Sequence, residues 1–476
     1  MGFFVINIRI KIVTFGKKLK ILCLSTALST GLYMASSGVL ADENQKTTLR
    51  DAVAVGVATN PEYGTVAASR RATDEELEQG SALFLPSLDL RGDIGMEHSD
   101  DVATRAGSGD DEEDLWRKEI GLTLTQMLFD GWEAHYEVKR QEARVMSSAH
   151  RVRETAELIG LSIVEAYLEV LRQRQLLMIS EQNVRDHIAI MDQINAGIKA
   201  GRSTRADGEQ AKARLASAKA TTANTRQALR NAEAGYLAEV GDKPASLELP
   251  EVPFGLLEKD VEEEVEKTLS NSPTLDIFAA DIETAYAEAQ GTKSTYYPQM
   301  DLQLNARTGH DLGGVQGRDT SASALVVMNW NLYRGGADVA RASEFVHRHQ
   351  QTKESHAEAE RSIENDVRQT WASMEASAER AKQFRAQVDA NSQVVKAYKD
   401  QFSLDRRTLL DVLDSQNELF VSKSNAVNSE FVQMLGVYRL LALKGQLLPS
   451  MEIDYPRESN VESDEKWSYK ERQKAR

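Results

Sequence analysis

The fold is decided by one stretch of sequence, Phe402-Ser403-Leu404-Asp405-Arg406-Arg407-Thr408-Leu409-Leu410-Asp411-Val412-Leu413-Asp414. A polar turn interrupts a long helical region here, and an apolar stripe resumes directly after it. Asp411 and Asp414 are three residues apart, so they share one face of the second helix. The stretch therefore predicts a helical hairpin with a charged tip.

A weaker copy of this turn lies earlier in the chain, at Gly201-Arg202-Ser203-Thr204-Arg205-Ala206-Asp207. Asp207 matches Asp411 at a spacing of 411 − 207 = 204, and Arg202 matches Arg406 at the same spacing. Two tips with matching charge at a fixed spacing indicate an internally duplicated chain.

Each half also contains a predicted β-hairpin, at about residues 86–129 and 298–333. Within them apolar residues alternate with polar ones, as in Leu88, Leu90, Ile94 and Met96 of the first hairpin and Met300, Leu302 and Leu304 of the second. This period of two is typical of strands with one apolar and one polar face. Before the hairpins the two halves are 273 − 61 = 212 residues apart, so the first hairpin carries eight extra residues.

These patterns predict two structural repeats, at 42–243 and 263–449, joined by a proline-containing linker at 244–262. Long helices are expected on either side of each tip, at about 132–200, 202–240, 336–402 and 408–448. In the first of these, the stripe of Leu161, Val164, Leu168, Leu171 and Met178 has coiled-coil spacing. The charged tail at 450–476 is predicted to be disordered.

The N-terminus has the pattern of an export signal. Lys17, Lys18 and Lys20 precede an apolar run from Ile21 to about Ala35, and small residues follow, so residues 1–41 are expected to be removed. The alternative is an uncleaved anchor helix, although the run is shorter than the ~20 residues that a membrane span needs. The single cysteine, Cys23, lies within this run, so the mature chain would have no disulfide.

The formal net charge of −16 argues against nucleic acid as a partner. Strands of about ten residues with one apolar face fit an outer-membrane barrel, but four strands leave open edges that lipid does not tolerate. Three copies would supply twelve strands. Aromatic residues stand near the strand ends, as membrane interfaces favour: Phe84, Trp116, Phe129, Trp132, Tyr296, Tyr297, Trp330 and Tyr333. The alternative is a soluble hairpin packed on helices.

The whole mature chain resembles the TolC family of outer-membrane efflux and secretion channels. The resemblance rests on the duplication, on Leu85-Pro86 and Tyr297-Pro298 before the hairpins, on Phe129-Asp130-Gly131 and Tyr333-Arg334-Gly335 after them, and on Arg407 to Asp414. Thr59-Asn60-Pro61-Glu62 with Leu85 to Leu90 is most similar to the type I secretion branch.

This resemblance implies a mixed α and β membrane protein, in which a homotrimer forms a twelve-stranded barrel in the outer membrane lipid of a Gram-negative bacterium and an α-helical tunnel in the periplasm. It implies a periplasmic adaptor (membrane fusion) protein and an inner-membrane ABC or RND transporter as partners. No enzymatic activity, cofactor or metal is expected. The function implied is an exit duct for type I protein secretion, and multidrug or small-molecule efflux is an alternative. A soluble periplasmic coiled-coil adaptor or scaffold is the alternative from another class.

The same resemblance implies a periplasmic gate at the two tips. Arg407 and Asp207 match residues that link neighbouring helix pairs, Asp411 and Asp414 match acidic rings at the constriction, and Phe402 stands where some members carry a tyrosine. The alternative is that all five are ordinary solvated residues. The spacing of His347 and His349 favours surface histidines over a metal site. The acidic run at Asp110–Asp114 is interpreted as a solvated loop, and a divalent-cation site is the alternative.

Overall fold

The computed structural model describes residues 47–100, 102–105, 112–404 and 406–461. The predicted signal peptide at 1–41, the turn residue Asp405, the tail beyond 461 and, of the acidic run, Asp110 and Asp111 lie outside the described residues. Glu113 and Asp114 of that run were expected in a loop, but they begin a strand. In the part of the chain that is described, no helix is both long enough and apolar enough to cross a membrane.

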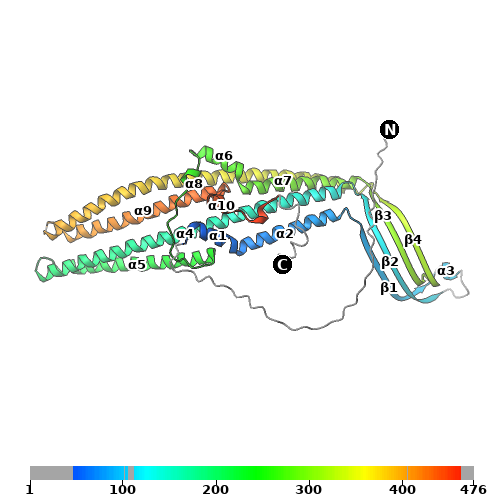
Figure 1. The fold of residues 1–476 in the computed structure, drawn as a ribbon, viewed down its shortest axis with the longest axis horizontal. Helices are drawn as coiled ribbons and strands as arrows, with labels where there is room; N and C mark the ends of the chain where they lie inside the picture. Colours follow the sequence, from blue (N-terminus) through cyan, green and yellow to red (C-terminus); the bar gives the residue numbers. More distant parts are fainter. Residues whose placement is uncertain (1–46, 101, 106–111, 405, 462–476) are drawn as a thin grey trace. The chain divides into compact units, whose positions relative to one another are not determined.

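The helices repeat in the two halves of the chain (Figure 1). The first half contains α1 (Leu49–Thr59), α2 (Pro61–Ala82), the short α3 (Val102–Arg105), α4 (Glu133–Lys199) and α5 (Arg205–Val240). The second contains α6 (Val261–Asn271), α7 (Pro273–Gly291), α8 (Ala337–Ser403), α9 (Leu409–Leu443) and the short α10 (Leu447–Ser450). Both α4 and α8 have 67 residues, and α5 and α9 have 36 and 35. The predicted duplication is therefore present as a duplication of structure.

Local sequence sets where these helices begin. The side chain of Asn60 accepts a hydrogen bond from the backbone N–H of Glu62 at 2.8 Å, and Pro61 occupies the first turn, where its missing N–H costs nothing. Pro273 likewise occupies the first turn of α7, although the Ser272 side chain before it makes no capping hydrogen bond. These two prolines mark where the helix before each hairpin begins, α2 in the first half and α7 in the second.

The four strands form one antiparallel sheet in the order β1-β2-β3-β4, with β1 (Ser87–Ser99), β2 (Glu113–Phe129), β3 (Gln299–Leu312) and β4 (Val315–Asn329). The register aligns Leu90, Leu122, Ala306 and Ala322 in one row. This apolar face is open in the single chain, where Leu90 is 70% exposed. Among the described residues, the strands pair only with their neighbours in this order, so the outer strands β1 and β4 each have a free edge.

The two hairpins differ at their tips. Gly313 and Gly314 join β3 to β4 with φ of +57° and +69°, as a two-residue hairpin turn requires. The β1–β2 connection is longer and includes α3, in agreement with the extra residues predicted there. It packs against the second turn so closely that a Cβ on Gly314 would lie 2.4 Å from Cγ2 of Thr104.

The largest apolar cluster lies where α1, α4, α5, α9 and α10 meet. Ile163, Val164 and Tyr167 of α4 are fully buried there, together with Leu441 of α9. The predicted stripe along α4 is correct near Val164, but Met178 is 62% exposed in the single chain.

The expectation of a disordered tail after residue 449 is wrong for residues 450–461. Met451, Ile453 and Tyr455 pack against this same cluster, and Arg50 of α1 donates to the carbonyl of Met451 at 2.9 Å. Farther along, Glu458 accepts a hydrogen bond from the Tyr63 hydroxyl at 2.9 Å. The segment is ordered because a few apolar residues among its charges find partners that a composition count does not reveal.

Candidate functional site

The two helical hairpins α4–α5 and α8–α9 end in tips on the side away from the sheet (Figure 1). Gly201 at the first tip has φ of +75°, and the backbone N–H of Arg202 closes the end of α4 on the carbonyl of Gly197 at 2.8 Å. At the second tip the N–H of Arg406 closes α8 on the carbonyl of Gln401 at 2.9 Å. The two turns thus end their long helices with the same type of hydrogen bond.

Both tips also start their second helix with the same capping box. The N–H of Thr204 donates to Oδ2 of Asp207 at 2.8 Å, and the N–H of Thr408 donates to Oδ2 of Asp411 at 3.1 Å. In return each threonine hydroxyl oxygen accepts from the aspartate backbone N–H, at 3.2 Å and 3.3 Å. Asp207 and Asp411 therefore stabilise the first turns of α5 and α9, whatever else they do.

Arg407 lies against its own tip. Its guanidinium carbon is 4.2 Å from the ring centroid of Tyr398, and its Nε donates to Oε1 of Gln401 at 3.1 Å. Its Nη1 is 3.8 Å from Oδ2 of Asp411. The ring, the amide and the carboxylate together hold the guanidinium over the end of α8.

The hydrogen bonds from the hydroxyl and backbone of Thr408, assisted by the charge of Arg407, lower the pKa of Asp411 below its ordinary value. The carboxylate is therefore kept ionised at the tip at neutral pH.

Asp414 has a different partner from Asp411 although they share a helix. Its Oδ1 lies 3.2 Å from Nη2 of Arg214 on α5, so this ion pair ties the second hairpin to the first. Asp186 of α4 makes a second link, since it accepts from Nε2 of Gln416 on α9 at 2.7 Å. About half of each Asp414 and Arg214 side chain is exposed, so solvent weakens this ion pair.

An apolar cluster lies beneath these charges and connects the two hairpins. Its buried members are Ile190, Ile194, Ala211, Leu409, Val412 and Leu413. Phe402 and Tyr398 pack on its edge, both half-buried. Phe402 thus serves the packing between hairpins, and it has no hydroxyl to join the polar contacts.

The structure brings Arg407, Asp411 and Phe402 to one tip, Asp207 to the other, and places Asp414 between the hairpins. Among the ion pairs of the described residues, Arg407 pairs with Asp411 and not with Asp207. Sequence reasoning missed Tyr398, four residues before Phe402 on the same helix face, and Arg214, seven residues after Asp207. Helical spacing places Tyr398 on the face of Phe402, but it does not identify the partner of Tyr398 or of Arg214. No group of three or more potential metal ligands occurs among the described residues.

Comparison with known proteins supports the fold and assigns a family. The sequence profile described as outer membrane efflux protein matches residues 57–238 and 265–440, one range within each half of the chain. The chain is 26% identical over 341 residues to "Outer membrane efflux protein BepC" of Brucella suis, covering 69% of this chain and 72% of that protein. It is 22% identical over 432 residues to "Alkaline protease secretion protein AprF" of Pseudomonas aeruginosa, covering 88% of this chain and 89% of that protein.

Among solved structures, the outer membrane protein VceC of Vibrio cholerae superposes with a TM-score of 0.71 at 16% identity, over 86% of this chain and 97% of that one. This likeness shows a shared fold of sheet and long helical hairpins, as the sequence predicted. The family consists of channels and not of enzymes. The chain therefore belongs to the outer membrane efflux protein family, has the TolC-type channel fold, and is located in the outer membrane with its helices in the periplasm.

Proposed function

We propose that three copies of this chain form one channel that serves as the exit duct of a tripartite export system. The observation that carries the proposal is the four-stranded sheet, which has an exposed apolar face and two free edges and continues directly into α4 and α8. Lipid does not tolerate free edges, so the edge of β1 must pair with β4 of another copy. A periplasmic adaptor and an inner-membrane transporter of the ABC or RND class supply the substrate.

Native mass spectrometry of the detergent-extracted protein tests the assembly. Trimers are expected, and a stable monomer that inserts as a barrel would overturn the proposal. An epitope inserted near Gly109, in the β1–β2 connection, should be labelled on intact cells. Labelling only after permeabilisation would contradict the proposed orientation.

Type I protein secretion is the proposed role within this class. AprF, whose name records secretion of an alkaline protease, is similar over nearly the full length of both chains, which supports this choice. Small-molecule efflux is the second candidate, favoured by the efflux function in the name of BepC. Deletion of the gene, followed by analysis of secreted proteins and of drug sensitivity, separates the two. Loss of a secreted protein with unchanged drug sensitivity supports the first, and the opposite pattern supports the second.

We further propose that the helical tips close the periplasmic end. In a trimer the α8–α9 tip of one chain faces the α4–α5 tip of the neighbouring chain. Arg407 of one chain can therefore reach Asp207 of its neighbour in addition to its own Asp411. Asp411 and Asp414 then contribute carboxylates around the threefold axis, where their repulsion favours opening. Each exposed contact contributes only about 0–1 kcal/mol. Such weak contacts, repeated three times, suit a gate that an adaptor can open.

The gate proposal is tested by single-channel recording in planar bilayers. Arg407→Ala should raise the conductance, whereas the matched change at the neighbouring Arg406 should not. Asp411→Asn with Asp414→Asn should weaken block by multivalent cations added from the periplasmic side, and Asn at position 411 keeps an oxygen that can accept from the backbone N–H of Thr408. If these variants conduct and are blocked like the parent, the tip charges are ordinary solvated residues and the constriction lies elsewhere.

A further inference from the structure

The polar face of the sheet carries an ordered network of charged side chains that is separate from the proposed gate at the helical tips. The register places Asp93, Glu119, Gly309 and Asp319 in one row across all four strands. The adjacent row on the same face contains Arg91 and Arg307 on either side of Gly121, followed by Ser321. A row with three carboxylates therefore lies beside a row with two arginines, on the face opposite Leu90 and Leu122.

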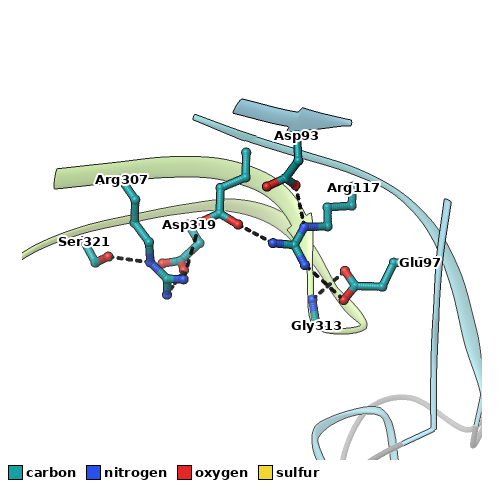
Figure 2. Close-up of polar contacts among 8 residues, drawn as sticks. Asp93, Glu97, Arg117, Arg307, Gly313, Asp319 and Ser321 are labelled. Carbon is teal, nitrogen blue, oxygen red and sulfur yellow. Dashed lines mark hydrogen bonds and ion pairs between the residues drawn. The ribbon is translucent and has the colours of Figure 1, made fainter. Parts of the chain in front are cut away.

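Arg117 is the centre of the first part of this network (Figure 2). Its Nε donates to Oδ1 of Asp93 at 2.8 Å, its Nη2 contacts Glu119, and its Nη1 lies 3.5 Å from Oε1 of Glu97. Oε2 of Glu97 in turn accepts from the backbone N–H of Gly313, in the β3–β4 turn, at 3.1 Å. One guanidinium therefore binds three carboxylates, and one of these carboxylates connects β1 to the far hairpin.

Arg307 is the centre of the second part. Its Nε donates to the Ser321 hydroxyl at 2.8 Å, and its Nη2 donates to Oδ2 of Asp319 at 3.2 Å, as Figure 2 shows. Its Nη1 lies 3.6 Å from Oε1 of Glu119, which also contacts Arg117. Glu119 thus joins the two arginines, and the network spans all four strands.

The charges on this face do not cancel. The register assigns it three arginines and seven carboxylates, so its formal charge is 3 − 7 = −4 per chain. These residues are Arg91, Arg117 and Arg307, with Asp89, Asp93, Glu97, Glu113, Glu119, Asp301 and Asp319. Arg117 and Arg307 hold four of the carboxylates at fixed positions. Fixed charges of one sign along a narrow passage raise the local concentration of the opposite ion.

We propose that this face lines the pore of the barrel and makes the barrel itself cation-selective, separately from the helical tips, with Arg117 and Arg307 setting its charge. The inference rests on the proposed trimeric channel, since only a closed barrel turns the polar face inward. The apolar face opposite carries Leu90, Ile94 and Leu122, all exposed, so lipid contact on that side leaves the charged face for water. Salt screens such charges over about 10 Å at 0.1 M, so the selectivity should increase as the salt concentration falls.

The test measures reversal potentials of single channels in a KCl gradient at low salt. It uses a background with Asp411→Asn and Asp414→Asn, so that the tips no longer contribute. Asp93→Asn with Asp319→Asn should lower the ratio of potassium to chloride permeability about twofold or more, and Arg307→Gln should raise it. The matched control is Lys118→Gln, because Lys118 neighbours Arg117 but points to the opposite face.

The outcomes separate the two proposals. If the parent forms no trimeric pore, the proposed function fails. If it forms a pore and the Asp93 and Asp319 change leaves the permeability ratio unaltered, the selectivity inference is overturned. An equal shift in the Lys118→Gln control would also overturn it, since the effect would then not depend on the face. Arg307 and Asp319 are half exposed, and trimer formation on native gels checks that their variants fold.

Discussion

Glu157 is a buried carboxyl at the point where the C-terminal segment crosses α4, and its replacement by Gln should stabilise the protein at alkaline pH. Its carboxyl accepts from the backbone N–H groups of Leu447 at 2.9 Å and Leu448 at 3.4 Å, and it contacts the Tyr455 hydroxyl. That hydroxyl has a single proton and lies 2.6 Å from the carbonyl oxygen of Gly445, which can only accept. Both contacts of the hydroxyl are hydrogen bonds only when Glu157 is protonated and donates to it.

The size of the expected stabilisation follows from the pKa of Glu157. Burial raises the pKa of Glu157 from 4.5 to about 7. Between these values the folded chain binds a proton that the unfolded chain has lost, so the free energy of unfolding falls as the pH rises through this window. The difference of 7 − 4.5 = 2.5 corresponds to about 3 kcal/mol per chain. Gln cannot lose a proton, so Glu157→Gln should match the parent near pH 4 and exceed it by about this amount at pH 8.

Circular dichroism of the detergent-purified protein, with denaturant midpoints between pH 4 and pH 8, measures this difference. Glu165→Gln is the control, because Glu165 is exposed on the same helix. The reasoning is refuted if Glu157→Gln has the same pH profile as the parent. It is also refuted if the variant is less stable at pH 8, which would mean that the charged carboxylate is the form the fold requires.

Three further changes test other contacts. The Lys444 and Glu264 side chains are 2% and 0% exposed, and their N and O atoms are 3.0 Å apart. Glu264→Gln should therefore lower the free energy of unfolding by about 3–5 kcal/mol, measured by denaturation. A loss of only about 0–1 kcal/mol, which is typical of an exposed ion pair, would contradict this. Thr408→Ala removes the cap of α9 and should cost about 1 kcal/mol, with faster amide exchange in the first turn of α9, whereas Thr408→Ser should not. In Gly314→Val the new side chain would clash with Thr104, and the positive φ at this position is unfavourable for valine. The substitution should therefore reduce the yield of trimers on native gels, and a normal yield would show that the turn can adapt.

Much of the fold could be predicted from the sequence because its signals are local. Asn60-Pro61 and Ser272-Pro273 mark helix starts by their own chemistry, and the alternation around Leu88 marks a strand by its period. The prediction of a mixed helix and strand architecture was correct for this reason. The extent of order after residue 449 was not predictable in this way, because Tyr455 is ordered by Glu157, 298 residues earlier in the chain.

The tip residues were predictable as a set, but their partners were not. Asp207 and Asp411 are three residues after a threonine, so their capping role follows from spacing alone. The pairing of Asp414 with Arg214 depends on how two hairpins pack, which a single helical period does not encode. The contact of Arg407 with Tyr398 likewise needs the turn geometry that folds the chain back over the end of α8.

The equal length of α4 and α8 restricts how this protein can change in evolution or by design. Each has 67 residues, about 100 Å at 1.5 Å per residue. A single inserted residue in α4 would rotate its tip by about 100° and advance it by about 1.5 Å, so Asp207 would no longer match Asp411. Length can therefore change only by matched insertions or deletions of about seven residues, two helical turns, in all four long helices together. Chimeras that exchange one hairpin between relatives should assemble only when the two parents share this length.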